Sequence, residues 1–331
     1  MSMPSWAWWL ISGVLGLVAF VAALPWLVRP LFRLLLWPRY RLRVLGLEHV
    51  PRGGPVLLAS NHLTWIDGFL LAAVVPRRGK ALVYAPYVDV PVVRWIARRA
   101  GLIPVPARGP RAQRAAIEAA RQALGRGEAI LIFPEAQLAR TGLMGPFHRG
   151  LEVMIKGPGP EAVPVIPVHL GNLWGSLFSF SGGRFLRKRP RGLRRTVVIA
   201  FGRPVPPPVT AFAVRQAVLE AGVRAAALGP GGRELPETID RTLPRWEHPE
   251  LGLLAVSAAD YRRGDVHQTG QKPGTVGQAA PGVALRVVDE AGRPLPPEGE
   301  GRLQALLPGR PDWVETGRRG SLDRDGFVRI D

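Results

Sequence analysis

The chain has 331 residues, no cysteine and a formal net charge of +19. The lack of thiols excludes disulfides and cysteine-based catalytic or metal sites, and an apolar fraction of 47% excludes general disorder. Residues 245–331 contain 12 Lys/Arg and 13 Asp/Glu, so the positive charge belongs to residues 1–244 and favours anionic partners.

The first segment is apolar and predicts a membrane anchor over residues 1–37. Residues 1–28 carry no charged side chain, and 6–28 are long enough for a membrane-spanning helix with tryptophans at both ends. A signal peptide would need a basic start, which is missing. Pro25 and Pro30 leave an interfacial hairpin open as an alternative.

The arginines that follow the apolar run predict the orientation of this anchor. By the positive-inside rule they place the rest of the chain in the cytoplasm. We therefore expect a protein of the inner (cytoplasmic) membrane, held by a single-pass or interfacial anchor and in contact with an anionic membrane surface.

Short apolar runs alternate with helical patterns over residues 38–208, which indicates an α/β domain. Strands are expected at 40–48, 55–60, 80–86, 128–135, 162–170 and 194–202, and helices at 67–75, 90–101 and 111–127.

The last third of the chain reads differently. Residues 209–250 predict a helix to about 228 and then a linker rich in Gly, Pro and charge. Residues 251–331 have short apolar runs between turns, which is typical of a small β-rich unit.

The segment "NHLTWID" places His62 and Asp67 five residues apart, directly after a strand-like run. On a regular helix the two side chains would point about 140° apart. They can meet only if His62 lies in the turn before a helix and Asp67 reaches back to it. A histidine oriented by a carboxylate is a typical general base. Alone, the pattern also fits a polar loop with a structural histidine.

A second carboxylate, Glu135, follows the run "AILIFP" and also lies just past a predicted strand. The carboxyl ends of strands in open α/β sheets are where ligand crevices form. We therefore expect His62, Asp67 and Glu135 to share one crevice.

These motifs resemble those of the glycerophospholipid (lysophosphatidic-acid-like) acyltransferase family. "NHLTWID" is similar to the first motif of that family, "GLIPVPARG" at 101–109 to the second, "IFPE" to the third and "VIPV" at 165–168 to the fourth. The resemblance spans about residues 38–205 and implies a glycerolipid-acyltransferase-like α/β domain.

The resemblance also implies a mechanism, in which His62 is the general base and Asp67 orients it. The acyl donor would be an acyl-CoA or acyl-carrier protein, the acceptor a lysophospholipid hydroxyl, and no metal or cofactor would be required. Glu135, Arg108 and Arg140 would bind the acceptor. We group Asn61 with these substrate-binding residues, although it could instead orient the loop or cap the next helix.

The third motif departs from the family pattern FPEGTRS. Here it reads "FPEAQLAR", so Ala136, Gln137 and Leu138 replace the glycine, the threonine and the arginine expected to contact phosphate. Arg140 or Arg108 would have to substitute for that arginine. A lysophospholipid with a larger headgroup is therefore as plausible an acceptor as a simple phosphate monoester.

Residues 270–331 resemble part of the adenylate-forming acyl-CoA synthetases, including "KPGTVG" and "LDRDGF". Arg318 stands where that family has the aspartate that holds ribose, so we expect a degenerate fragment without adenylation activity over 251–331, and chemistry that does not depend on it. The pairing resembles the fused 2-acylglycerophosphoethanolamine acyltransferase/acyl-acyl-carrier-protein synthetases.

Two hypotheses follow, an acyltransferase and a non-catalytic lipid- or acyl-carrier-binding pseudoenzyme of the same fold. The altered third motif favours the second, whereas the presence of His62, Asp67 and Glu135 favours the first. Nucleic acid is not expected as a partner, because the chain has an apolar first segment and no recognisable binding motif.

Overall fold

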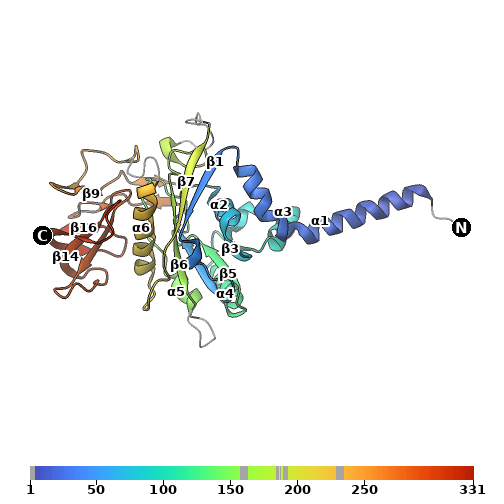
Figure 1. Ribbon diagram of the computed structural model, residues 1–331, viewed down its shortest axis with the longest axis horizontal. Helices are drawn as coiled ribbons and strands as arrows, with labels where there is room; N and C mark the ends of the chain where they lie inside the picture. Colours follow the sequence, from blue (N-terminus) through green and yellow to red (C-terminus); the bar gives the residue numbers. More distant parts are fainter. Residues whose placement is uncertain (1–3, 157–162, 184–185, 187, 189–192, 229–234) are drawn as a thin grey trace.

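The computed structural model describes residues 4–156, 163–183, 186, 188, 193–228 and 235–331. A long helix at the N-terminus leads into a seven-stranded sheet with helices on both faces, and a set of smaller β-sheets forms the C-terminal end (Figure 1). The α/β class predicted for residues 38–208 is confirmed by this sheet.

The central sheet is mixed, with strand order β1-β7-β6-β2-β5-β3-β4. The five strands from β6 to β4 run parallel to one another, while β7 is antiparallel to β6 and parallel to β1. The strands are β1 (Tyr40–Leu45), β2 (Val56–Ser60), β3 (Gly79–Tyr84), β4 (Leu102–Val105), β5 (Ala129–Ile132), β6 (Val165–Gly171) and β7 (Arg195–Phe201).

Strand β2 lies in the middle of the sheet and is buried on both faces. Val56 and Leu58 pack into the cluster on one face, whereas Leu57 and Ala59 pack into the cluster on the other. This alternation follows from the two-residue period of a strand, and it explains why the sequence of β2 is an unbroken apolar run. The carboxyl end of β2 is therefore held rigidly in the interior.

Helices cover both faces of the sheet. The end of α1 (Ser5–Leu36) and α2 (Asp67–Val74) pack on one face, while α4 (Pro110–Gly125), α5 (Gly150–Ile155) and α6 (Ala211–Leu228) pack on the other. Helix α3 (Pro91–Arg99) lies beside β4. Short 3-10 turns are η1 (Leu47–His49), η2 (Ala85–Tyr87) and η3 (Ser181–Gly183).

The C-terminal strands form three small antiparallel sheets. These are β10-β11, β12-β9-β8 and β13-β14-β15-β16. The strands are β8 (Arg245–His248), β9 (Gly252–Val256), β10 (Tyr261–Arg263), β11 (Val266–Gln268), β12 (Gln278–Ala279), β13 (Ala284–Val288), β14 (Glu300–Leu306), β15 (Val314–Leu322) and β16 (Val328–Ile330).

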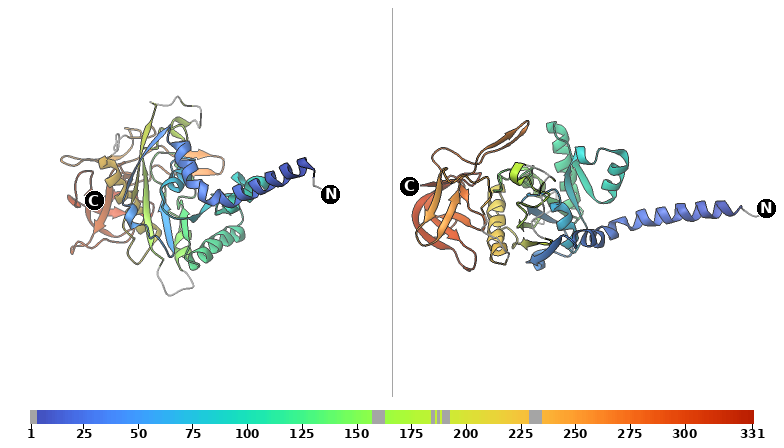
Figure 2. Two further views of the ribbon diagram at one scale, coloured as in Figure 1. Left: turned by 45° about the vertical axis from the view of Figure 1, so that its right-hand side comes forward. Right: turned by 90° about the horizontal axis from the view of Figure 1, so that it is seen from above.

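Helix α6 lies between the central sheet and the C-terminal strands (Figures 1 and 2). On one side Val214 and Val218 pack with the central sheet. On the other side Phe212 packs with the core of the C-terminal strands, and Val223 packs with Ala284. The C-terminal unit therefore shares a hydrophobic core with the α/β domain, which argues against a dispensable tail.

The structure differs from the sequence-based expectations at three elements. Strand β4 and helix α5 were not predicted, because each is very short and β4 contains Pro104. Residues 245–248, predicted as linker, form β8 and pair with β9. Residues 229–234 of that predicted linker lie outside the described residues.

The predicted membrane-spanning helix at 6–28 is not supported. A helix does form there, but within the described part of the chain no helix is both long and apolar enough to cross a membrane. The side chains at positions 7, 17–18, 20–22 and 24–29 of α1 lie outside the described residues.

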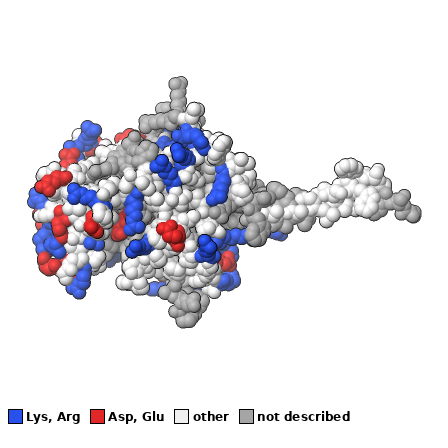
Figure 3. All heavy atoms as spheres, viewed as in Figure 1, with Lys and Arg blue, Asp and Glu red and all other residues white. Residues whose placement is uncertain are grey.

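Surface charge follows the asymmetry of the sequence. In the view of Figure 3, Lys and Arg predominate over the α/β domain, whereas acidic and basic side chains are interspersed over the C-terminal strands at the left.

Candidate active site

The turn that follows β2 holds the first predicted site residues at the carboxyl edge of the parallel strands. Asn61 is buried, and its amide Nδ2 donates to the backbone carbonyl of Leu170 at 3.1 Å while its Oδ1 accepts the Leu170 N–H at 2.7 Å. Asn61 thereby ties the end of β2 to the end of β6. These contacts orient the loop; helix α2 has Ile66, not Asn61, at its N-cap.

Asp67 reaches back to His62 as the spacing required. His62 Nδ1 lies 2.9 Å from Asp67 Oδ2, and the same oxygen accepts the backbone N–H groups of Leu63 at 2.7 Å and Thr64 at 2.9 Å. The hydroxyl of Thr64 donates to Oδ1. One carboxylate thus holds the whole turn from His62 to Thr64.

The surroundings of Asp67 decide which histidine nitrogen carries a proton. Asp67 is fully buried at the first turn of α2 and is surrounded by donors, so it acts only as an acceptor. His62 Nδ1 must then donate, which leaves the lone pair on Nε2. The His62 side chain is 22% exposed, and it can accept a proton through Nε2.

The ring of His62 is also held from one face. It stacks on Phe133, with ring centroids 4.0 Å apart and an interplanar angle of 15°. Phe133 follows β5 directly, so two neighbouring parallel strands fix the histidine. Stacking and the Asp67 bond together leave the imidazole little rotational freedom.

Glu135 is buried behind this turn rather than open to a ligand. Its Oε1 accepts the backbone N–H of His62 at 2.7 Å and its Oε2 accepts the backbone N–H of Gly145 at 2.8 Å. The N–H of Ala139 donates to the carbonyl of His62 at 2.8 Å. The segment after β5 therefore forms hydrogen bonds with both the N–H and the carbonyl of His62. A direct contact of Glu135 with the acceptor stays a prediction.

Burial makes Glu135 an unusual acid. Loss of solvent raises its pKa from 4.5 to about 7, although the two N–H donors and the nearby guanidinium of Arg215 oppose the shift. Arg215 is itself buried in α6 and donates to the carbonyls of Met144 and Gly145, each at 3.0 Å. Burial lowers the pKa of Arg215 to about 10.

The two predicted arginines occupy different environments. Arg140 is half-buried, with its guanidinium 3.3 Å from the ring centroid of Phe180 and 5.5 Å from that of Tyr261. Arg108 is exposed and forms an ion pair with Asp265 of the C-terminal unit. Arg140 adjoins Ala139 and so lies next to the His62 turn, whereas the ion pair of Arg108 directs it to the C-terminal unit instead.

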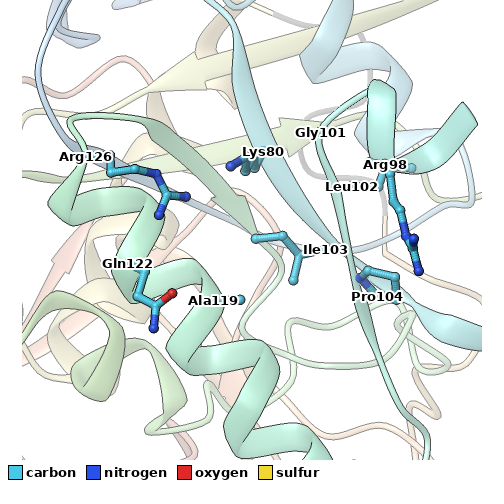
Figure 4. A pocket seen from close by; sticks show the side chains of 9 residues that line it. All are labelled: Lys80, Arg98, Gly101, Leu102, Ile103, Pro104, Ala119, Gln122 and Arg126. Carbon is cyan, nitrogen blue, oxygen red and sulfur yellow. The ribbon is translucent and has the colours of Figure 1, made fainter. Parts of the chain in front are cut away.

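A basic hollow of about 270 Å³ lies elsewhere (Figure 4). It is lined by Lys80 and Arg98 together with Arg126 from the end of α4, and Lys80 and Arg126 both pair with Glu128. Its walls come from the amino ends of β3 and β4, at the edge of the sheet opposite His62. It is therefore not part of the site around His62.

Several contributors to the site were not anticipated from the sequence. These are Thr64, Phe133, Arg215 and Gln268, which accepts the Arg140 N–H. Only Thr64 had a usable signal, because "TWID" matches the S/T-x-x-D pattern of a helix start and Asp67 does bond back to the Thr64 N–H. Gln268 and Arg215 are distant in the sequence.

Comparison with known proteins finds similarity over the part of the chain that holds these residues. Residues 41–171 match the family model described as Acyltransferase. The matched region contains His62, Asp67, Glu135, Arg108 and Arg140, and it ends with β6.

Two curated relatives are acyltransferases by name. A chloroplastic 1-acyl-sn-glycerol-3-phosphate acyltransferase of Brassica napus is 26% identical over 136 residues, which is 41% of this chain and 38% of that protein. A lyso-ornithine lipid O-acyltransferase of Pseudomonas aeruginosa is 30% identical over 129 residues, which is 38% of this chain and 46% of that protein. The match thus spans less than half the length of either relative.

Among solved structures, the 1-acyl-sn-glycerophosphate acyltransferase of Thermotoga maritima has a TM-score of 0.45 at 18% identity. That likeness covers 61% of this chain and 78% of the other.

Proposed function

We propose that the protein transfers a fatty acyl group from a thioester donor, an acyl-CoA or acyl-carrier protein, to the hydroxyl of a lysophospholipid. The observation that supports this most is the His62–Asp67 pair, with Nδ1 at 2.9 Å from the carboxylate and Nε2 free to take a proton. The match of residues 41–171 to the acyltransferase family model and the names of the relatives support the same chemistry.

In the proposed reaction the acceptor oxygen attacks the thioester carbonyl while His62 Nε2 takes the hydroxyl proton. The tetrahedral intermediate then collapses, the carbon–sulfur bond breaks, and the leaving thiolate takes the proton from the imidazolium. Buried Asp67 stabilises that imidazolium without becoming protonated. A free alcohol is a poor nucleophile at neutral pH, so this proton transfer and the positioning of the two substrates are what the site supplies.

The acceptor headgroup is proposed to bind beside Arg140. Arg140 follows Ala139, whose N–H donates to the His62 carbonyl. The Nε of Arg140 has no hydrogen-bond partner among the described residues. A guanidinium presents forked donors suited to phosphate oxygens. Arg140 would thus take the role of the arginine that Leu138 replaces in the third motif.

We also propose that the chain works at an anionic membrane surface. Trp6, Trp8 and Trp9 on α1 and Trp37 just after it are exposed, and Trp95 on α3 lies between arginines at 94, 98 and 99. Indole rings with neighbouring cations are typical of the headgroup region of a bilayer. Sedimentation with vesicles containing anionic lipid, compared with zwitterionic vesicles, tests this.

The function is tested with purified protein and a His62→Ala variant, given labelled acyl-CoA or acyl-carrier protein and a panel of lysophospholipids. His148→Ala is the matched control, because His148 is an exposed histidine on the segment after Glu135. We expect wild type and the control to form diacyl lipid and His62→Ala to form none. Turnover by His62→Ala would overturn the assignment of the base.

The second candidate is a non-catalytic lipid-binding protein of the same fold. One observation favours it. Gln137 of the altered third motif donates to the His267 carbonyl of the C-terminal unit at 3.0 Å, so this side chain makes a structural contact in place of one with a substrate. If wild type binds lysophospholipid or donor but turns over with no combination, this candidate replaces the enzyme.

A further inference from the structure

The hairpin β10–β11 of the C-terminal unit is fastened to the segment that holds the candidate base. Gln268 Oε1 accepts the Arg140 N–H at 2.6 Å and the Thr141 N–H at 3.3 Å, and Gln268 Nε2 donates to the Leu143 carbonyl at 3.1 Å. Gln137 Nε2 donates to the His267 carbonyl at 3.0 Å. Four hydrogen bonds thus join the hairpin to residues 137–143.

The tip of the hairpin is fastened a second time. Asp265, which lies in the turn between β10 and β11, pairs with Arg108 on the loop between β4 and α4. The hairpin therefore bridges two loops at the carboxyl edge of the central sheet, and it extends from the C-terminal strands toward that edge (Figure 2, right). The only acidic side chain of the hairpin is already paired with this arginine.

Strand alternation decides which side chains of the hairpin face Arg140. Tyr261 is opposite Gln268 and Arg263 is opposite Val266 in the antiparallel register, so these four share one face. Gln268 and Tyr261 contact Arg140 from that face. Arg262 and His267 are opposite each other and lie on the other face.

The face toward Arg140 concentrates positive charge among aromatic rings. Arg263 is near enough to Arg140 to help lower its pKa, after the larger effect of burial. The rings of Phe180 and Tyr261 lie against the guanidinium. Tyr87 is near enough to influence the pKa of Arg140, and its ring contacts that of Trp65, which follows Thr64, at 4.1 Å between centroids. Among the described residues, no carboxylate is one of the charged groups that act on Arg140, and two neighbouring positive charges on one face favour an anion.

We propose that the hairpin β10–β11 forms one wall of the acceptor site, where Arg263 and Tyr261 act with Arg140 to bind an anionic headgroup such as a phosphate. The C-terminal unit then serves as a specificity element of the α/β domain. This inference rests on the proposed function, because the bound molecule is the acceptor of the same reaction.

The test compares Arg263→Ala with Arg262→Ala in the full chain. The two arginines are adjacent, both are exposed, and they lie on opposite faces of the hairpin. The acceptors are lysophosphatidic acid, whose headgroup is anionic, and a monoacylglycerol, which carries no charge. KM and kcat are measured for each, and equilibrium binding of lysophosphatidic acid is measured without donor.

We expect Arg263→Ala to weaken binding and raise the KM for lysophosphatidic acid about fivefold to tenfold, with little change in kcat. The monoacylglycerol should be unaffected, and Arg262→Ala should stay within about twofold of wild type for both. Tyr261→Leu should raise the same KM, because it removes a ring beside Arg140.

The outcomes separate the two claims. If wild type turns over and Arg263→Ala behaves like Arg262→Ala, the role of the hairpin in acceptor binding is refuted and the acyltransferase activity is supported. If wild type binds lysophosphatidic acid without turnover and only Arg263→Ala loses affinity, the role of the hairpin is supported and the acyltransferase activity is refuted. If wild type neither binds nor turns over any lysophospholipid, both are overturned.

Discussion

The backbone N–H of His62 donates a 2.7 Å hydrogen bond to the carboxylate of Glu135, which lies 73 residues later in the chain. Asp67 holds the side chain of the same histidine at 2.9 Å. Two buried carboxylates therefore hold His62: Glu135 fixes its backbone and Asp67 fixes its ring. Glu135 acts through His62 and is a positioning residue in this geometry.

Glu135 should make stability depend on pH with a defined sign. Its pKa is raised to about 7 in the folded chain, so between pH 4.5 and 7 the folded state keeps a proton that the unfolded state has lost. This contribution to stability is fully present below pH 4.5 and is lost as the pH rises through 7. By linkage the loss is on the order of 3 kcal/mol.

Glu135→Gln isolates this effect in urea unfolding at pH 5, 6, 7 and 8. Wild type should lose stability relative to the variant as the pH rises. His169, whose pKa burial lowers to about 4, gives the opposite slope in both proteins and cancels in the difference. Parallel curves for the two proteins would contradict the prediction.

Asp67→Asn should cost activity far more than its small change in shape suggests. An amide presents N–H groups to a site that is full of donors, so the imidazole loses its fixed tautomer. We expect kcat to fall by about 10²- to 10⁴-fold in the acyl-transfer assay. Thr64→Val removes only one of the four donors and should cost less than about tenfold. An Asp67→Asn variant with near wild-type kcat would exclude the orienting role.

Ala136→Gly should stabilise the protein. Ala136 has φ +54°, a left-handed conformation that glycine adopts without the strain caused by a Cβ, and it stands where the related third motif has glycine. We expect a gain of up to about 1 kcal/mol in unfolding free energy. The midpoint of thermal unfolding measures it, and a lower midpoint would show that the turn is not strained by Ala136.

Arg215 should couple the C-terminal unit to the site. It donates to the carbonyls of Met144 and Gly145, and a Cβ added at Gly326 would overlap its guanidinium. Arg215→Met leaves both carbonyls without this donor in the interior and should cost about 2–4 kcal/mol in urea unfolding. Arg215→Lys keeps the charge but loses the forked donors of the guanidinium, so its free energy of unfolding should lie between those of wild type and Arg215→Met. Equal stability of all three proteins would refute the coupling.

Removal of residues 251–331 should compromise the fold, contrary to the expectation from sequence that the tail is dispensable. The deletion would expose Phe212, Val223 and Leu143, which pack with the C-terminal strands. A side chain of this kind contributes about 1.5–3 kcal/mol when it is fully buried, and the partly buried Phe212 contributes less. Size-exclusion chromatography and thermal unfolding should show aggregation or a lowered midpoint. A monomeric truncation with the wild-type midpoint would contradict this.

Local sequence patterns predicted the secondary structure well where a segment shows one clear hydrophobic pattern. The strands near 56–60 and 129–132 and the helix near 110–125 formed close to their expected positions, because an apolar run or a helical stripe specifies each alone. Helix α6 was found but its role was not. Its apolar residues are not confined to one stripe, since the helix packs against the central sheet on one side and the C-terminal strands on the other.

The sequence by itself determined the α/β class, the turn that must bring Asp67 to His62, and the placement of Glu135 at a neighbouring strand end. These follow from chain geometry over a few residues and from the rule that parallel strands share one carboxyl edge. Only the tertiary structure decided that Glu135 holds the His62 backbone, that Phe133 stacks on the ring, and that Gln268 reaches the Arg140 backbone. Such contacts join residues up to 128 positions apart, and the direction of each side chain depends on packing that no local pattern encodes.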